Sequence, residues 1–282
     1  MNIKTKKKIP AGYILLCLAV VLCLAVYIFP VAFAAITSLK STDEFYASIW
    51  ALPKEFLVSN YAKAFSVGKI GTYMMNSVII SAASLVSIQV LALLAAYALS
   101  RLKIPHVEIF LMALLLMQVL PTESMIIPLY IIVSKLHLLN IPYISTILGY
   151  VGWSLPGTII ILKNFFDTVP SDLLEAARID GSGELNTMGR IILPLMKGPM
   201  VTCLIMNFTY VWGELMWAQV TTLLTDKGVT ITVGLLNFQG QYGTNWPLLT
   251  AAIVMILVPL IVIFVVLQKY FVAGLTAGGV KG

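Results

Sequence analysis

The sequence predicts an all-α integral membrane protein with six membrane-spanning helices. Its 282 residues are 60% hydrophobic and only 11% charged, with a mean hydropathy of +0.96, whereas soluble domains carry about 25% charged residues. Apolar segments recur along the chain at about the 20 residues needed to cross a hydrocarbon core of about 30 Å. Because so few charged groups cannot cover a globular surface, we expect lipid to be the main solvent of the chain.

The predicted spans follow one another within one membrane domain, residues 1–282. They cover residues 14–36, 72–99, 109–134, 143–162, 198–220 and 247–267. The third span is interrupted by Pro121 and Glu123, and the fifth contains Glu214. The first span follows a lysine-rich start, as a cleaved signal peptide would, but its uncharged stretch is longer than the roughly 7–15 residues of a signal core. We therefore expect an uncleaved first helix, with a cleaved signal as the alternative.

The distribution of Lys and Arg predicts that both termini lie in the cytoplasm. With six spans and the N-terminus inside, twelve of the 18 basic residues fall in cytoplasmic segments. The six others fall outside, at Lys40, Lys54, Lys63, Lys69, Lys135 and Lys227. Cytoplasmic loops carry the excess of basic residues in membrane proteins. This orientation places residues 163–197 in the cytoplasm and residues 39–71 and 221–246 outside.

The cytoplasmic segment 163–197 carries the pattern of two short helices. Gly181 suits a helix end, and Ser182 can cap a second helix that follows it. The residues expected on one apolar face of the first helix are Leu173, Leu174 and Ala177. Such a projection can dock in a cleft of another protein. A solvated connector fits the same pattern.

These residues carry a resemblance to a known family. Their spacing resembles the EAA signature of ABC importer permeases, and the matching residues are Glu175, Ala176, Ala177, Gly181, Ile191, Leu193 and Pro194. Residues 95–101 and 127–130 resemble the carbohydrate branch of that family. Residues 238–246 and 274–282 resemble the smaller permease of the maltose type most closely.

The resemblance implies a type I ABC importer permease fold in a bacterial or archaeal cell membrane, with a family core over residues 72–270. Such a permease pairs with a second, homologous permease and with two cytoplasmic ATPase subunits. An extracellular or periplasmic solute-binding protein delivers the sugar or oligosaccharide. The implied contacts with the ATPase are Glu175, Ala176, Ala177, Asp180, Gly181, Leu193 and Pro194. The implied contacts with the binding protein are Asn237, Gln239, Gln241, Tyr242 and Asn245.

Two details of the resemblance stay open. The family often has Trp-Asn-Glu in the fifth span, whereas Trp212, Gly213 and Glu214 stand here, so Gly213 cannot supply a polar side chain. The cytoplasmic tail, residues 271–282, is expected to dock near the ATPase interface by resemblance. Its glycines would equally suit a frayed chain end.

The sequence predicts no catalysis and no cofactor in this chain. The single Gly-Lys pair, Gly68 and Lys69, is followed by Ile70 rather than Ser or Thr, and no glycine stands five residues before it, so it is not a P-loop. ATP and Mg²⁺ are therefore expected on the partner ATPase. No metal-ligating or catalytic constellation stands out, and the three cysteines all lie in apolar segments.

A polar stripe in the fifth span is the candidate translocation path. Asn207, Tyr210 and Glu214 are spaced i, i+3 and i+7, which places them on one side of a helix. A charge at the membrane centre costs at least about 2.5 kcal/mol, so Glu214 should face protein or a water-filled path. The same side chains would also serve a seam between helices.

A second class of function remains, a free-standing secondary transporter or channel subunit. Inverted repeats would favour a secondary transporter, and the sequence shows none. Only two acidic residues, Glu123 and Glu214, are placed within spans.

Overall fold

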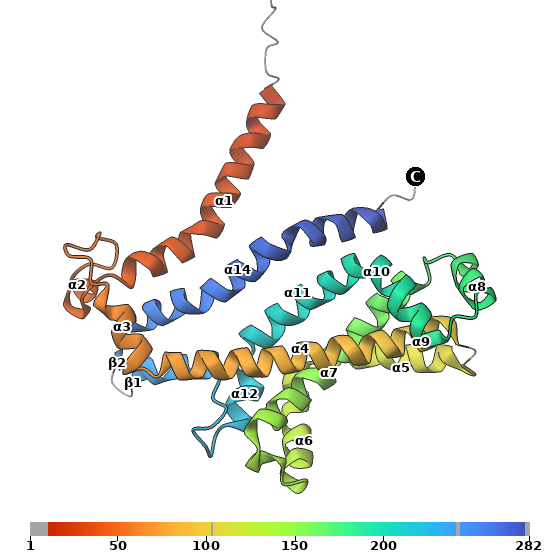
Figure 1. Cartoon of the computed structure of the whole chain (residues 1–282). Helices are drawn as coiled ribbons and strands as arrows, with labels where there is room; N and C mark the ends of the chain where they lie inside the picture. Colours follow the sequence, from red (N-terminus) through yellow and green to blue (C-terminus); the bar gives the residue numbers. More distant parts are fainter. Residues whose placement is uncertain (1–10, 103, 241–242, 280–282) are drawn as a thin grey trace, which may run out of the picture. The chain divides into compact units, whose positions relative to one another are not determined.

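The computed structural model describes residues 11–102, 104–240 and 243–279, and most of them are helical. The chain divides into two compact units, of which the first is Met1–Gly68 with Asn237–Leu257 and the second is Lys69–Leu236 with Val258–Gly282. Figure 1 labels the helices and strands of both units along the chain. Each unit is described by itself.

The first unit contains one long apolar helix and short elements around the outer polar segments. These are α1 (Ala11–Thr37), α2 (Thr42–Ala47), α3 (Ser59–Ser66), β1 (Gln239–Gly240), β2 (Gly243–Thr244) and the start of α14 (Trp246–Gly279). Ser41 and Glu44 form a reciprocal capping box that begins α2. Lys40, only 1% exposed, donates from Nζ to the carbonyls of Ser48 (3.2 Å) and Ile49 (2.8 Å) beyond the end of this helix.

The second unit contains most of the membrane helices and the predicted cytoplasmic segment. Its longer helices are α4 (Ile70–Arg101), α5 (Val107–Val119), α6 (Thr122–Lys135), α7 (Pro142–Phe166), α8 (Ser171–Ile179) and α11 (Lys197–Gly213). Shorter elements are η1 (Leu138–Asn140), α9 (Glu184–Thr187), the π-helix η2 (Met188–Ile192), α10 (Leu193–Leu195), α12 (Met216–Thr221) and α13 (Ile231–Gly234), and η3 (Leu235–Phe238) leads back to the first unit.

The six predicted spans correspond to four continuous helices and two bent pairs of helices, if each bent pair is one span. Among the described residues, four helices are long and apolar enough to cross a membrane, and the number rises to six if each bent pair is one span. The continuous helices are α1, α4, α7 and α14, which contain the first, second, fourth and sixth predicted spans. The chain is thus a multi-pass membrane protein with a helical fold.

The third predicted span is not one straight helix. It divides into α5 and α6, which meet at an angle of 105°. Leu120 and Pro121 between them have extended backbone, with ψ angles of 125° and 127°. Proline has no N–H to continue a helix, and this is the physical reason for the break at the position where the sequence showed an interruption.

The fifth predicted span ends earlier than the sequence analysis placed it. The helix α11 stops at Gly213, Glu214 is extended (φ −69°, ψ 135°), and α12 begins at Met216. Glu214 therefore lies at a break between two helices and not inside one continuous span. The last helix, α14, is longer than predicted, since it continues through the glycine-rich segment to Gly279, and the remaining tail residues lie outside the described part of the chain.

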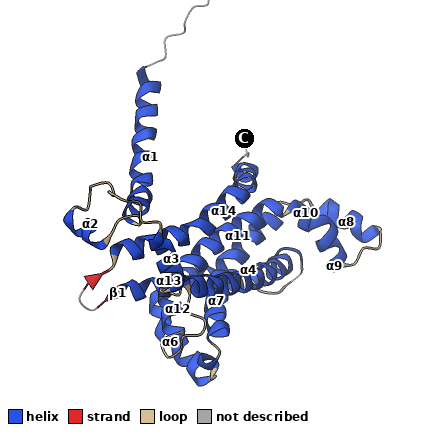
Figure 2. Cartoon of the chain, turned by 60° about the vertical axis from the view of Figure 1, so that its left-hand side comes forward, coloured by secondary structure: helices blue, strands red, loops and turns tan. Residues whose placement is uncertain are grey.

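The core of the second unit lies where α4 packs along α7, with α11 beside both (Figure 2). Ala92 and Ala96 of α4 are fully buried, and such small side chains allow two helices to approach closely. They share a buried cluster with Leu162, Phe166 and residues of the cytoplasmic segment. This packing ties segment 163–197, predicted to be cytoplasmic, to the membrane helices.

Candidate functional site

The predicted end of the first cytoplasmic helix is confirmed in detail. Gly181 has φ +77°, the left-handed conformation that ends many helices and favours glycine. The N–H of Ser182 donates to the carbonyl of Ala177 at 2.9 Å, which is the 6→1 bond of a Schellman motif. The direction in which the chain leaves α8 is therefore fixed by Gly181.

The second short helix starts close to the predicted position but is less regular than expected. Ser182 makes side-chain contacts rather than a helix cap: its hydroxyl accepts from Asn186 (2.9 Å) and Thr187 (3.1 Å). The helix α9 then continues into the π-helix η2 and the short α10, which contains Leu193 and Pro194. Leu193 packs against the buried cluster, whereas Pro194 is exposed.

The helix α8 has an inner face that packs and an outer face that is open. Leu174 and Ala177 are buried, as predicted, whereas Leu173, at the edge of this face, is 43% exposed. The outer face comprises Asp172, Glu175, Ala176 and Ile179. Ile179, a large apolar residue that precedes Asp180 and Gly181 in the chain, is 86% exposed. This composition suits contact with another protein.

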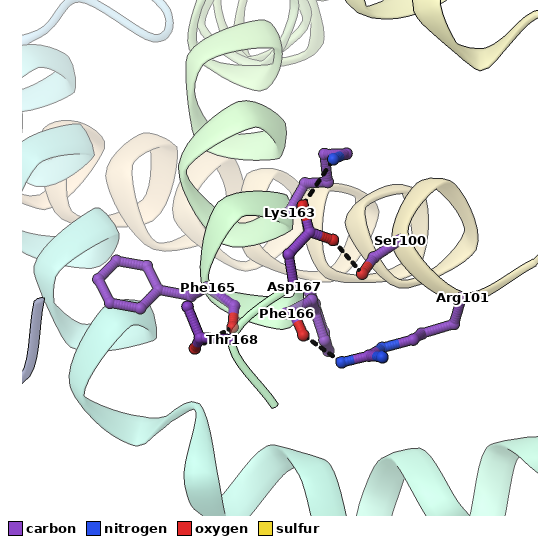
Figure 3. Close-up of polar contacts among 7 residues, drawn as sticks. All are labelled: Ser100, Arg101, Lys163, Phe165, Phe166, Asp167 and Thr168. Atoms are coloured by element: carbon purple, nitrogen blue, oxygen red, sulfur yellow. Dashed lines mark hydrogen bonds and ion pairs between the residues drawn. The ribbon is translucent and has the colours of Figure 1, made fainter. Parts of the chain in front are cut away.

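A cluster of polar contacts holds the chain just before α8, where α4 and α7 end (Figure 3). Ser100 Oγ donates to Asp167 Oδ1 at 2.6 Å, and Lys163 Nζ donates to Asp167 Oδ2 at 2.7 Å. Arg101 Nη2 donates to the carbonyls of Phe166 and Val169, the latter at 2.7 Å. These carbonyls at the end of α7 are therefore satisfied by a cation from another helix.

The environment of Asp167 favours the ionised form of this carboxyl group. Partial burial alone would raise the pKa of Asp167. The hydrogen bonds from Lys163 and Ser100 and the charges of Lys163 and Arg101 outweigh that effect, so that the pKa lies below its usual value. The carboxylate can thus accept both hydrogen bonds throughout the physiological range.

The predicted stripe in the fifth span faces a groove that crosses α5, α7 and α11. Asn207 and Tyr210 line a cavity of about 510 Å³, and Tyr210 also lines an adjoining cavity of about 210 Å³ with Glu214. Polar side chains are concentrated there, namely Gln118, Thr122, Glu123, Ser154, Thr158, Asn207, Tyr210 and Glu214. Trp153 lines both cavities. The larger cavity is also lined by apolar side chains, among them Leu115, Ile161 and Met206, so the lining is mixed.

Within this groove, Glu214 also has a structural role. Its carboxylate accepts from the backbone N–H groups of Trp217 (2.8 Å) and Ala218 (3.1 Å) and from the hydroxyl of Tyr150 (2.9 Å). These bonds satisfy the first N–H groups of α12, which would otherwise lack partners. Asn207 similarly donates to Thr158 at 2.9 Å. These contacts support the seam interpretation of the stripe, and the path interpretation stays a prediction.

The segment that carries the predicted contacts with the binding protein forms a short hairpin in the first unit. Gln239 pairs with Thr244 and Gly240 with Gly243. Asn245 Oδ1 accepts from the N–H of Leu248 at 3.3 Å and so caps α14. Asn237 and Gln239 are exposed. The predicted contacts Gln241 and Tyr242 lie outside the described residues.

Several residues of the site were missed by the sequence analysis. Gln118, Trp153 and Thr158 lie within apolar spans, and polar or amphipathic side chains at such positions were the available signal. Ser100 and Arg101 belong to a stretch that was noticed only for its resemblance. Their partners are more than 60 residues away, so no local spacing could reveal them.

Comparison with solved structures supports the architecture. The structure aligns with a bacterial ABC transporter involved in the import of the acidic polysaccharide alginate, at a TM-score of 0.80 and 20% sequence identity. The alignment covers 96% of this chain and 100% of that chain. At this level of identity the likeness shows the fold, which is that of an ABC importer permease.

Comparison with known sequences supports the family. The chain is 33% identical over 255 residues to the probable ABC transporter permease protein YurM of Bacillus subtilis, covering 90% of this chain and 84% of that protein. It is 32% identical to the sulfoquinovosyl glycerol transport system permease protein SmoH of Agrobacterium fabrum (90% and 89% covered). It is also 32% identical to the melibiose/raffinose/stachyose import permease protein MelC of B. subtilis (87% and 88% covered).

A family model described as binding-protein-dependent transport system inner membrane component matches residues 77–277, which include the groove, the cytoplasmic segment and its polar contacts. The chain belongs to this family of transport permeases.

Proposed function

We propose that this chain is one of two permease subunits of an importer for a sugar or oligosaccharide, powered by two cytoplasmic ATPase subunits. A solute-binding protein outside the cell delivers the substrate. The observation that carries the proposal is the family match over residues 77–277, which spans a cytoplasmic helix with an open outer face. Relatives named for sulfoquinovosyl glycerol and for melibiose, raffinose and stachyose support the sugar class. Both termini lie in the cytoplasm in this proposal.

The energy for transport comes from the partner ATPase. The outer face of α8, with Glu175, Ala176 and the exposed Ile179, docks in a cleft of that subunit. Alanine permits close approach, and Ile179 supplies apolar area that is exposed in the chain alone. Asp180 and Gly181 then set the direction of the chain towards Leu193 and Pro194.

Co-purification tests the proposed function against a free-standing transporter. Extracted in mild detergent, a tagged importer subunit is expected to bring a second permease and an ATPase with it in constant ratio. Recovery of the chain alone or as a homo-oligomer, still competent for sugar transport after reconstitution, would establish the secondary transporter instead.

The groove across α5, α7 and α11 forms this chain's share of the translocation path. Its hydroxyl and amide groups can exchange hydrogen bonds with a sugar, and the face of Trp153 can contact the apolar side of a sugar ring. Gln118 is exposed in the groove, so its amide is available to a passing substrate.

Replacing Gln118 with leucine is expected to slow sugar uptake about fivefold, since one hydrogen bond contributes about 1 kcal/mol net. Leucine keeps the size of the side chain and removes its polar groups. Stimulation of ATP hydrolysis by the loaded binding protein should persist. Gln219→Leu, on an exposed position of α12 that lines neither cavity of the groove, is the matched control. Unchanged uptake kinetics for Gln118→Leu would contradict a role of the groove in the translocation path.

The outer hairpin contacts the docked binding protein. Gln239 is exposed on β1, so a Gln239→Cys variant, made without Cys17, Cys23 and Cys203, should react with a water-soluble maleimide. We expect the loaded binding protein to slow this labelling when ATP is present, because it covers the hairpin. Equal labelling rates with and without the binding protein would contradict the contact.

A further inference from the structure

Three side chains on one face of the cytoplasmic end of α4 reach the chain on both sides of α8. Tyr97, Ser100 and Arg101 are spaced i, i+3 and i+4, so they lie together on the last turns of the helix. We refer to Tyr97, Ser100 and Arg101 as the α4 clamp. Their partners are the segment that enters α8 and the helix α9 that follows it.

On the entry side, the clamp binds backbone as well as a side chain. Arg101 donates from one nitrogen to the carbonyls of Phe166 and Val169, and Ser100 donates to Asp167. Figure 3 shows the Arg101 side chain extending from the end of α4 to the carbonyl of Phe166. Two carbonyls three residues apart fix the course of the chain between them, so the start of α8 is held relative to α4.

On the exit side, the clamp binds α9. The hydroxyl of Tyr97 donates to Glu184 Oε2. The Tyr97 ring packs edge-on against Phe166, with ring centroids 5.8 Å apart. Tyr97 therefore joins the segment before α8 to the segment after it.

The apolar contacts of α8 do not supply this fixation by themselves. Its inner face contributes Leu174 and Ala177, and burial of apolar area is not directional. Hydrogen bonds are directional, and those of the α4 clamp attach both ends of the α8 segment to one rigid helix. That helix packs along α7 and α11, which carry Trp153 and Asn207 of the groove.

We propose that the α4 clamp is the positioning device that makes α8 and the groove-lining helices move as one body when the ATPase moves. The inference rests on the proposed function, because it assigns a role in coupling to that same cytoplasmic segment. Arg101 is the central positioning residue, since it holds two backbone carbonyls of the entry segment. Loss of the Arg101 side chain should uncouple ATP hydrolysis from transport in complexes that still assemble.

The test compares Arg101→Met, which removes the donors and keeps the stem, with Arg101→Lys, which keeps one cationic donor. Complete complexes with binding protein are reconstituted in proteoliposomes, and sugar transported per ATP hydrolysed is measured. Coupling between sites is commonly a factor of about 5–150, so we expect Arg101→Met to lower this ratio at least about fivefold. Arg101→Lys should restore part of it, and Lys197→Met, an exposed cation outside the clamp, should leave it unchanged.

An assembled Arg101→Met complex with the wild-type ratio of transport to hydrolysis would overturn the proposal. A change that Arg101→Lys fails to restore in any part would also overturn it, because a cationic donor is what the clamp requires. If the Arg101→Met complex does not assemble, the same ratio of transport to hydrolysis is measured for Tyr97→Phe, which removes only the hydroxyl. A lowered ratio is then expected, and a wild-type ratio would overturn the proposal. A wild-type complex without substrate-stimulated hydrolysis would instead count against the proposed function.

Discussion

Replacing Gly181 with valine is expected to lower sugar uptake about tenfold or more while the protein still enters the membrane. A residue with a side chain costs roughly 1–2 kcal/mol in the left-handed conformation that Gly181 adopts at φ +77°, and each 1.4 kcal/mol is a factor of ten in an equilibrium. The space around a Cβ at this position is open, so the cost arises from the backbone and not from a clash. The strained chain would leave α8 in a different direction and misplace its docking face.

Two matched variants separate backbone conformation from side-chain size in this experiment. Asparagine adopts the left-handed conformation more readily than other residues, so Gly181→Asn should retain most uptake. Gly183→Val places the same side chain two residues later, where space is also open and φ is not positive, and it should have little effect. Membrane levels of each variant are measured by immunoblotting alongside uptake. Normal uptake by Gly181→Val would contradict the assigned role of this turn.

Replacing Glu214 with alanine is expected to destabilise the permease by about 1–3 kcal/mol, the cost of leaving buried donors without an acceptor. The change leaves the N–H groups of Trp217 and Ala218 and the hydroxyl of Tyr150 without the carboxylate they bind. The expected result is a lower midpoint of thermal unfolding in detergent and a lower yield of assembled complex.

The matched variants for Glu214 grade this effect. Glu214→Gln keeps one acceptor oxygen of similar reach, so its loss of stability should be smaller than that of alanine. Tyr150→Phe removes a single hydroxyl donor and should cost the least, about 1 kcal/mol for one net hydrogen bond. An alanine variant with an unchanged unfolding midpoint would show that Glu214 does not hold the break between α11 and α12.

The continuous spans could be predicted from the sequence because apolar length alone decides whether a helix can cross a membrane. Thus α4 and α7 begin and end within a few residues of the predicted bounds. Composition says nothing of direction, however, so the 105° turn between α5 and α6 was visible only as an interruption at Pro121. At Glu214 the error had a specific cause, since the acid was assigned to a helix although its carboxylate caps the next one.

The site was predictable where a residue type has a local conformational role. Gly181 was identified correctly because only local backbone geometry is needed to end a helix. The exposure of Leu173 was not, because apolar spacing shows that residues share a face of a helix but not how far the neighbouring elements cover that face. The contacts of Arg101 depend on two helices meeting, and the sequence of either helix alone does not contain that information.

The central claim is that this chain couples substrate passage to ATP hydrolysis on a partner subunit. The most direct test measures ATP hydrolysis by the complete complex in proteoliposomes while binding protein is added with and without sugar. The account predicts hydrolysis that rises with the loaded binding protein, sugar accumulating inside the vesicle compartment that corresponds to the cytoplasm, and loss of both in Gly181→Val. Sugar uptake that proceeds without ATP, or hydrolysis that ignores the binding protein, would contradict it.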